Sequence, residues 1–142
     1  MEKQIPRGLR TTFLVHVIVA GIFGLVFLLI PDVYAKLTGL PVQDWAMSIG
    51  RMLGATQLGF SASSWLAYKE TLWERVKIVV QMEVVWNILG TLAALYGVIF
   101  GGFPVVYWTN VVIMAAFAVA FSGSSHQVCT SSNDTKHTRG SA

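Results

Sequence analysis

The chain has 142 residues, of which 54% are hydrophobic and only 12% are charged, and its mean hydropathy is +0.61. A soluble domain carries about 25% charged residues, so this composition excludes an ordinary soluble globular protein. The single cysteine, Cys129, excludes an intrachain disulfide, a CxxC redox motif and a four-cysteine zinc site. The net charge is +3, but the basic residues are spread along the chain, so we expect no nucleic-acid partner.

Four apolar segments dominate the chain, at residues 12–30, 46–68, 76–100 and 104–122. Each is long enough as a helix to cross about 30 Å of hydrocarbon, whereas barrel strands would be about half as long and would alternate in polarity. The segments therefore predict an all-α integral membrane protein with four membrane-spanning helices. Its lipid bilayer is the first expected partner.

The connections between these segments contain helix-breaking residues. Val33, Tyr34, Leu37 and Leu40 lie at helical spacing between the first two spans, and Gly39 is placed as a helix stop. The region 31–45 therefore predicts a short helix at the membrane interface. Residues 1–11 form a basic N-terminus, and residues 123–142 are rich in Ser and Thr and predict a disordered polar tail.

Lys and Arg are distributed unequally between the two sides of the predicted membrane domain. One side holds eight of them, namely Lys3, Arg7, Arg10, Lys69, Arg75, Lys77, Lys136 and Arg139, and the other holds only Lys36 and Arg51. Positively charged loops stay in the cytoplasm, so this split predicts that both termini are cytoplasmic.

Small residues follow steps of three and four along the predicted spans. These candidate packing positions are Gly50, Gly54, Gly90, Ala94, Gly97, Ala116 and Ala120. Helices in lipid use such residues for close approach, and heptad-like spacing is typical of left-handed packing. The pattern predicts a left-handed four-helix bundle.

Polar residues within the spans fall into three layers when depth is counted at 1.5 Å per residue. The predicted polar ladder, from the cytoplasmic side outward, is His16, Glu83 and Ser61, then Gln57 and Asn87, then Arg51 and Asn110. Ser64 reaches the depth of the first layer as well. A carboxylate inside a span costs roughly 2.5 kcal/mol or more unless it is paired, hydrated or protonated, so Glu83 is the most informative residue.

Glu83 has two interpretations. It could be a proton or cation site with His16 as its partner. Alternatively, it is a neutral group that locks helix packing through a hydrogen bond to Ser61 or His16, or a side chain that reaches toward the nearby membrane surface.

The other polar residues carry similar alternatives. Arg51 is either an interfacial anchor or an anion-binding group near Asn110, and Gln57 and Asn87 are either interhelical contacts or ligands. Haem binding by His16 would need a second histidine at the same depth, which His126 does not supply. No nucleotide-binding, hydrolase or zinc-protease motif occurs, so we assign no catalytic residue, metal or cofactor.

Two pairs of short stretches resemble a known group of proteins. Residues 50–55 (GRMLGA) with 64–67 (SWLA), and residues 30–32 (IPD) with 37–41 (LTGLP), resemble the DoxX-like and related small four-helix membrane proteins of uncharacterised function. The resemblance covers residues 11–121. It implies the four-span architecture and no particular activity.

Three functions remain open at this level. The first is a non-enzymatic accessory or assembly protein that forms a homo-oligomer or joins a larger membrane complex, with Gly21, Ala55 and Gly59 available for a second interface. The second is an oligomeric transporter or channel whose path is the polar ladder. The third is a membrane-embedded enzyme or redox subunit that binds a quinone, haem or lipid near His16, Glu83 and Trp86.

Overall fold

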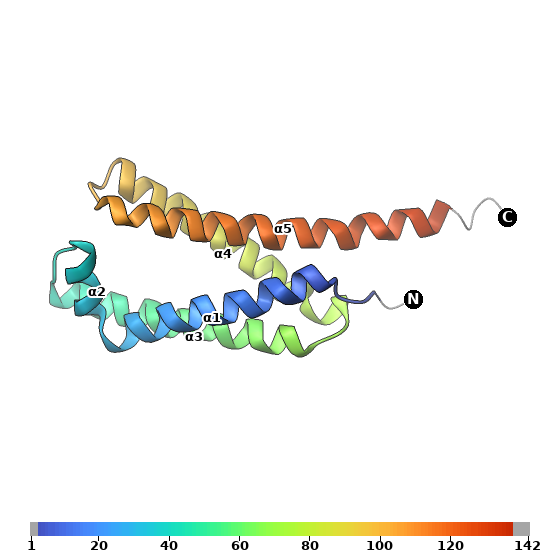
Figure 1. Cartoon of the computed structure of the whole chain (residues 1–142), viewed down its shortest axis with the longest axis horizontal. Helices are drawn as coiled ribbons and strands as arrows, with labels where there is room; N and C mark the ends of the chain where they lie inside the picture. The colour runs from blue at the N-terminus through green and yellow to red at the C-terminus, as the bar shows by residue number, and fades with distance from the viewer. Residues whose placement is uncertain (1–2, 138–142) are drawn as a thin grey trace.

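A computed structural model describes residues 3–137 of the chain, with side chains described as far as residue 126. The elements in chain order are α1 (Arg7–Leu29), α2 (Pro31–Thr38), α3 (Asp44–Lys69), α4 (Trp73–Ile99), the 3-10 helix η1 (Val105–Tyr107) and α5 (Trp108–His137) (Figure 1). Within the described residues the only β-type contact is an isolated bridge between Gln4 and Leu72. The predicted all-α class is confirmed.

Three of the helices are long and apolar enough to cross a membrane: α1, α4 and the segment Val105–His126, which comprises η1 and most of α5. This supports a membrane protein. The fourth expected span, α3, is 26 residues long, but its glycine, serine, glutamine and arginine residues lower its hydropathy, and it does not belong to this group. A count of four spans is therefore not established by composition.

The turn into α3 follows the predicted chemistry. Pro31 begins α2, and Gly39 ends it in the left-handed conformation with φ 76°, where its N–H bonds back to the Ala35 and Lys36 carbonyls. A short helix therefore lies between the first two long helices, as predicted. Its location at a membrane interface stays a prediction.

The long helices pack as two pairs, α1 with α3 and α4 with α5 (Figure 1). In the first pair, a Cβ added to Gly54 would lie 2.8 Å from the Gly24 carbonyl oxygen and 2.9 Å from the Leu28 Cα, so the backbones almost touch. In the second pair, Gly90 accommodates the end of the Met114 side chain. The left-handed four-helix bundle is not confirmed, because close packing is concentrated within each pair.

The other predicted packing positions have varied surroundings. Gly50 faces Pro31, Gly97 faces Phe103, Ala94 lines a cavity, and Ala116 and Ala120 line a shallow groove that also includes Thr12 and Val15 of α1. Gly21 is half-buried and faces the Ser61 hydroxyl of α3. Gly59 has open space around it.

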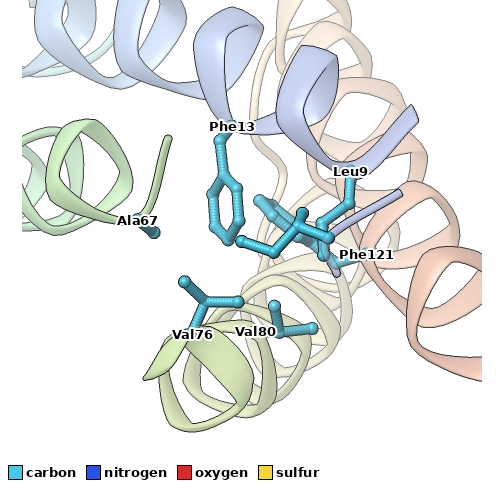
Figure 2. Packing of buried hydrophobic residues seen from close by; sticks show 7 residues of the cluster. Leu9, Phe13, Ala67, Val76, Val80 and Phe121 are labelled. Atoms are coloured by element: carbon cyan, nitrogen blue, oxygen red, sulfur yellow. The ribbon is translucent and has the colours of Figure 1, made fainter. Parts of the chain in front are cut away.

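The two pairs meet at one end of the molecule, which we call the closed end. Its core contains Leu9, Phe13, Ala67, Val76, Val80 and Phe121, contributed by α1, α3, α4 and α5 (Figure 2). The N-terminal segment joins this end through hydrogen bonds from the Ile5 N–H to the Thr71 oxygen and from the Trp73 N–H to the Lys3 oxygen. The apolar core thus fixes the two pairs to each other.

Basic residues follow the same division. Lys3, Arg7, Arg10, Lys69, Arg75 and Lys77 belong to the chain segments at the closed end, whereas Lys36 is in α2 near the opposite end. At the closed end, Arg10 donates to the Tyr68 carbonyl at 3.4 Å and lies over the Tyr68 ring. The predicted charge asymmetry therefore matches the two ends of the fold.

The last helix is longer than the fourth predicted span. α5 continues past residue 122 to His137, so the segment expected to form a disordered tail is helical as far as the structure describes it. No proline follows Pro104, and a single glycine such as Gly123 is tolerated inside a helix. Residues 138–142 of the predicted tail lie outside the described residues.

Candidate functional site

A cavity of about 630 Å³ lies between the two helix pairs, on the side away from the closed end. Every helix contributes to its wall, which is mainly aliphatic and aromatic and includes Phe23, Phe27, Trp86 and Phe117. The polar residues of the wall are His16, Tyr34, Gln43, Gln57, Asn87, Tyr107 and Asn110. Among the described residues, no Lys, Arg, Asp or Glu lines the cavity.

Three buried polar side chains from three different helices meet beside this cavity. His16 of α1, Ser64 of α3 and Glu83 of α4 are 4%, 0% and 0% exposed, respectively. The Ser64 hydroxyl donates to Glu83 Oε1 at 3.1 Å, and His16 Nδ1 lies 2.9 Å from Ser64 Oγ. His16 Nδ1 and Glu83 Oε1 are 3.5 Å apart, so the serine is the bridge between them. We call these three residues the buried triad.

The surroundings of the buried triad are otherwise apolar. The His16 ring makes edge-on contacts with Phe117 and Phe121 of α5, at centroid distances of 4.8 and 5.6 Å. Within the described part of the chain, the second carboxyl oxygen of Glu83, Oε2, is buried without a hydrogen-bond partner. An unpaired oxygen is costly in an apolar site, which makes Glu83 the most informative position of the triad.

One more polar side chain continues this layer along α4. Asn87 is 2% exposed, and its Nδ2 donates to the Glu83 backbone oxygen at 2.8 Å, while Thr91 Oγ1 donates to the Asn87 backbone oxygen at 2.7 Å. Asn87 also lines the cavity. It therefore connects the backbone beside Glu83 with the cavity wall.

The structure brings most of the predicted polar ladder together, but not all of it. His16, Gln57, Asn87 and Asn110 line the cavity, and Asn110 Nδ2 donates to the Tyr34 hydroxyl at 3.4 Å. Glu83 does not line the cavity and is reached through Ser64 and His16.

Two predicted site residues lie elsewhere. The Ser61 hydroxyl donates to the Val17 backbone oxygen at 2.9 Å, so it joins α3 to α1 instead of contacting Glu83. Arg51 is exposed on α3 and does not line the cavity with Asn110. Conversely, the predicted ladder lacks Ser64, although its depth matches the layer of His16 and Glu83, and it lacks the cavity residues Tyr34 and Tyr107.

The described residues contain no group of three or more His, Cys, Asp or Glu side chains placed to hold a metal ion. What the site does offer is an apolar chamber with a few convergent polar groups. At one point of its wall, His16 joins that chamber to a buried carboxyl group. This arrangement can bind an amphipathic molecule and can hold or move a proton.

No protein-family model, curated protein or solved structure matches this chain. The fold defines its class as an all-helical protein with three helices suited to a membrane. The resemblance to DoxX-like proteins gains no support from these comparisons and stays a prediction.

Proposed function

We propose that this protein is a small multi-pass membrane protein that binds a neutral amphipathic molecule in the cavity between its two helix pairs. The observation that carries the proposal is the cavity itself. Its volume of about 630 Å³ is in the range of small-molecule sites, which are typically ~300–1,000 Å³ and mainly apolar with a few placed polar groups. The absence of charged residues from the described wall favours an uncharged ligand, because a buried charge needs a partner.

Binding accounts for the cavity better than conduction does. A channel needs a polar path along its whole length, whereas the closed end is filled by apolar side chains such as Phe13, Val80 and Phe121. The predicted transporter would have to open this core. A transporter remains an alternative, and the cavity residues Gln57 and Asn87 would line its path.

The proposal includes four membrane crossings, by α1, α3, α4 and α5, with both termini in the cytoplasm. Although α3 is less apolar, its 26 residues give a length of about 39 Å, and it packs along the apolar α1. The eight-to-two distribution of Lys and Arg supports the orientation. Reporter fusions after Lys69 and after Ile99 test it, because the first should report a cytoplasmic connection and the second an external one.

The accessory role, which the sequence favours, is compatible with binding but has less support. Of the three small residues expected at a second interface, only Ala55 and Gly59 are exposed. A homo-oligomer or a larger membrane complex therefore stays a prediction. A native mass spectrum measures this oligomeric state.

The binding proposal is tested by native mass spectrometry of the protein extracted gently from its own membrane. The wild-type chain should carry an additional small-molecule mass. In Ala94→Phe, the larger side chain extends from the wall into the cavity, so this variant should lose the additional mass. Ala62→Phe makes the same change at an exposed site of α3 and should keep it. If the wild type carries no additional mass, or if the two variants retain it equally, the proposed binding function is wrong.

A further inference from the structure

The buried triad has an order that suits proton movement. His16 belongs to the cavity wall, Ser64 is the middle group, and Glu83 lies behind both, fully buried. A serine hydroxyl is both a donor and an acceptor, so it can connect an imidazole nitrogen to a carboxyl group in either direction. The direct separation of 3.5 Å between Nδ1 and Oε1 is too long for a good hydrogen bond. The connection therefore depends on Ser64.

Two hydrogen-bonding arrangements fit the same heavy-atom positions. In the first, His16 Nδ1–H donates to Ser64 Oγ, and the Ser64 hydroxyl donates to an ionised Glu83. In the second, protonated Glu83 donates from Oε1 to Ser64 Oγ, and the Ser64 hydroxyl donates to His16 Nδ1.

We propose that the buried triad is a proton relay. Through it, Glu83 passes a proton to His16 when His16 binds a carbonyl-bearing ligand of the quinone class in the cavity. This inference rests on the proposed binding function and names its ligand class. The wall supplies aromatic rings for a planar head group, including Phe117 and Trp86. Among the described wall residues there is no Lys or Arg that could pair with a carboxylate or phosphate head group.

The proton transfer is balanced without any redox step. The Glu83 Oε1–H bond breaks as a new O–H bond forms on Ser64 Oγ, and the original Ser64 proton passes to His16 Nδ1. A neutral pair thereby becomes an imidazolium and a carboxylate. The other ring nitrogen of His16, Nε2, has no hydrogen-bond partner within the described residues, so its N–H is available to a ligand oxygen. A charged donor makes a stronger hydrogen bond, and ligand binding therefore favours the proton at His16.

Among the described side chains, no other charged group competes for this proton at the triad. α3 contributes Ser64, and α5 contributes the Phe117 and Phe121 rings. Within the described residues, the only ionisable partner within 4 Å of either His16 or Glu83 is the other member of the pair, with Nδ1 and Oε1 3.5 Å apart. The nearest basic side chain toward the closed end on α1, Arg10, donates instead to the Tyr68 carbonyl.

Infrared difference spectroscopy on protein in lipid nanodiscs tests the relay, with decylubiquinone as the probe and quenching of tryptophan fluorescence as the measure of binding. Glu83 is the only fully buried acidic side chain in the described part of the chain, so its protonated C=O stretch is spectroscopically distinct. We expect decylubiquinone to reduce that band in the wild type. Glu83→Gln should lack the band and so assign it.

Ser64→Ala removes the bridge and leaves the cavity wall intact, because Ser64 does not line the cavity. It should bind decylubiquinone but lose the change in the carboxyl band. Ser61→Ala, one turn earlier on α3, is the matched control and should keep the change, because its hydroxyl contacts the Val17 oxygen.

Three results would overturn the inference, and they are distinguishable. Decylubiquinone binding with an unchanged carboxyl band, or with the same band change in Ser64→Ala, excludes the relay and leaves the binding function standing. Failure of decylubiquinone to bind excludes the quinone class. In that case the mass spectra of wild type and Ala94→Phe decide separately whether the cavity binds any other molecule.

Discussion

Substitution of Gly54 by alanine should destabilise the protein, because it forces α1 and α3 apart. The added Cβ would overlap the Leu28 backbone nitrogen and would lie 2.8 Å from the Gly24 oxygen and 2.9 Å from the Leu28 Cα, and these are backbone atoms that cannot rotate away. Carbon atoms pack best at about 3.5–4.0 Å, so the helices must separate locally by roughly 0.6–1 Å.

The energy of this separation can be worked out from two opposing effects. A gap of about 0.5–1 Å removes a quarter to a half of each dispersion contact across the interface, and overpacking of this kind typically costs about 1–3 kcal/mol. Alanine regains about 1 kcal/mol of helix propensity relative to glycine. The difference between the two effects is a loss of up to about 2 kcal/mol in the free energy of unfolding of Gly54→Ala.

Gly59→Ala is a matched control on the same helix. Nothing lies within 4 Å of a Cβ added at Gly59, so only the gain in helix propensity remains, and we expect stabilisation by up to about 1 kcal/mol. Both variants are measured by titration of detergent-solubilised protein with sodium dodecyl sulfate, followed by circular dichroism. Equal stability of the two variants would refute the close α1–α3 contact.

Three further substitutions test other local features by the same unfolding titration. Gly39→Ala should cost about 1–2 kcal/mol, because residue 39 has a positive φ of 76°; an unchanged midpoint would contradict this helix end. Gly90→Ala should cost less than Gly54→Ala, because the atoms in its way are the flexible end of Met114; a larger loss would mean that Met114 cannot move. Ser61→Ala should cost about 0.6 kcal/mol, the mean for polar contacts between membrane helices, and a loss of several kcal/mol would contradict its single contact with Val17.

The depth of each polar residue could be predicted from the sequence, but its rotation about the helix axis could not. A constant rise of 1.5 Å per residue placed His16, Glu83 and two serines at about the same level. Ser61 and Ser64 are three residues apart, so they differ by only about 60° around α3. That angle is enough for Ser61 to contact the α1 backbone and for Ser64 to contact Glu83 on α4. Choosing between them requires the positions of both neighbouring helices.

Which helices pair with each other could not be predicted from the sequence either. Heptad-like stripes predict which face of a helix contacts another helix, but not which helix it contacts. Gly54 lies at a helix contact as expected. Its partner is α1, whose backbone at Gly24 and Leu28 lies directly against Gly54. α3 and α4 are joined by a short connection, yet each packs mainly against another helix.

A small residue in a membrane helix has two opposite meanings, which the sequence does not separate. At Gly54 the missing side chain is replaced by the backbone of α1, so the space is filled. At Ala94 the small side chain borders open space, because Ala94 lines the cavity of about 630 Å³. The two sites should respond differently to a larger side chain, because bulk at Gly54 must separate two helices, whereas bulk at Ala94 enters open space. A variant with Phe at residue 94 should therefore fold and lose its ligand, which distinguishes a binding chamber from a packing interface.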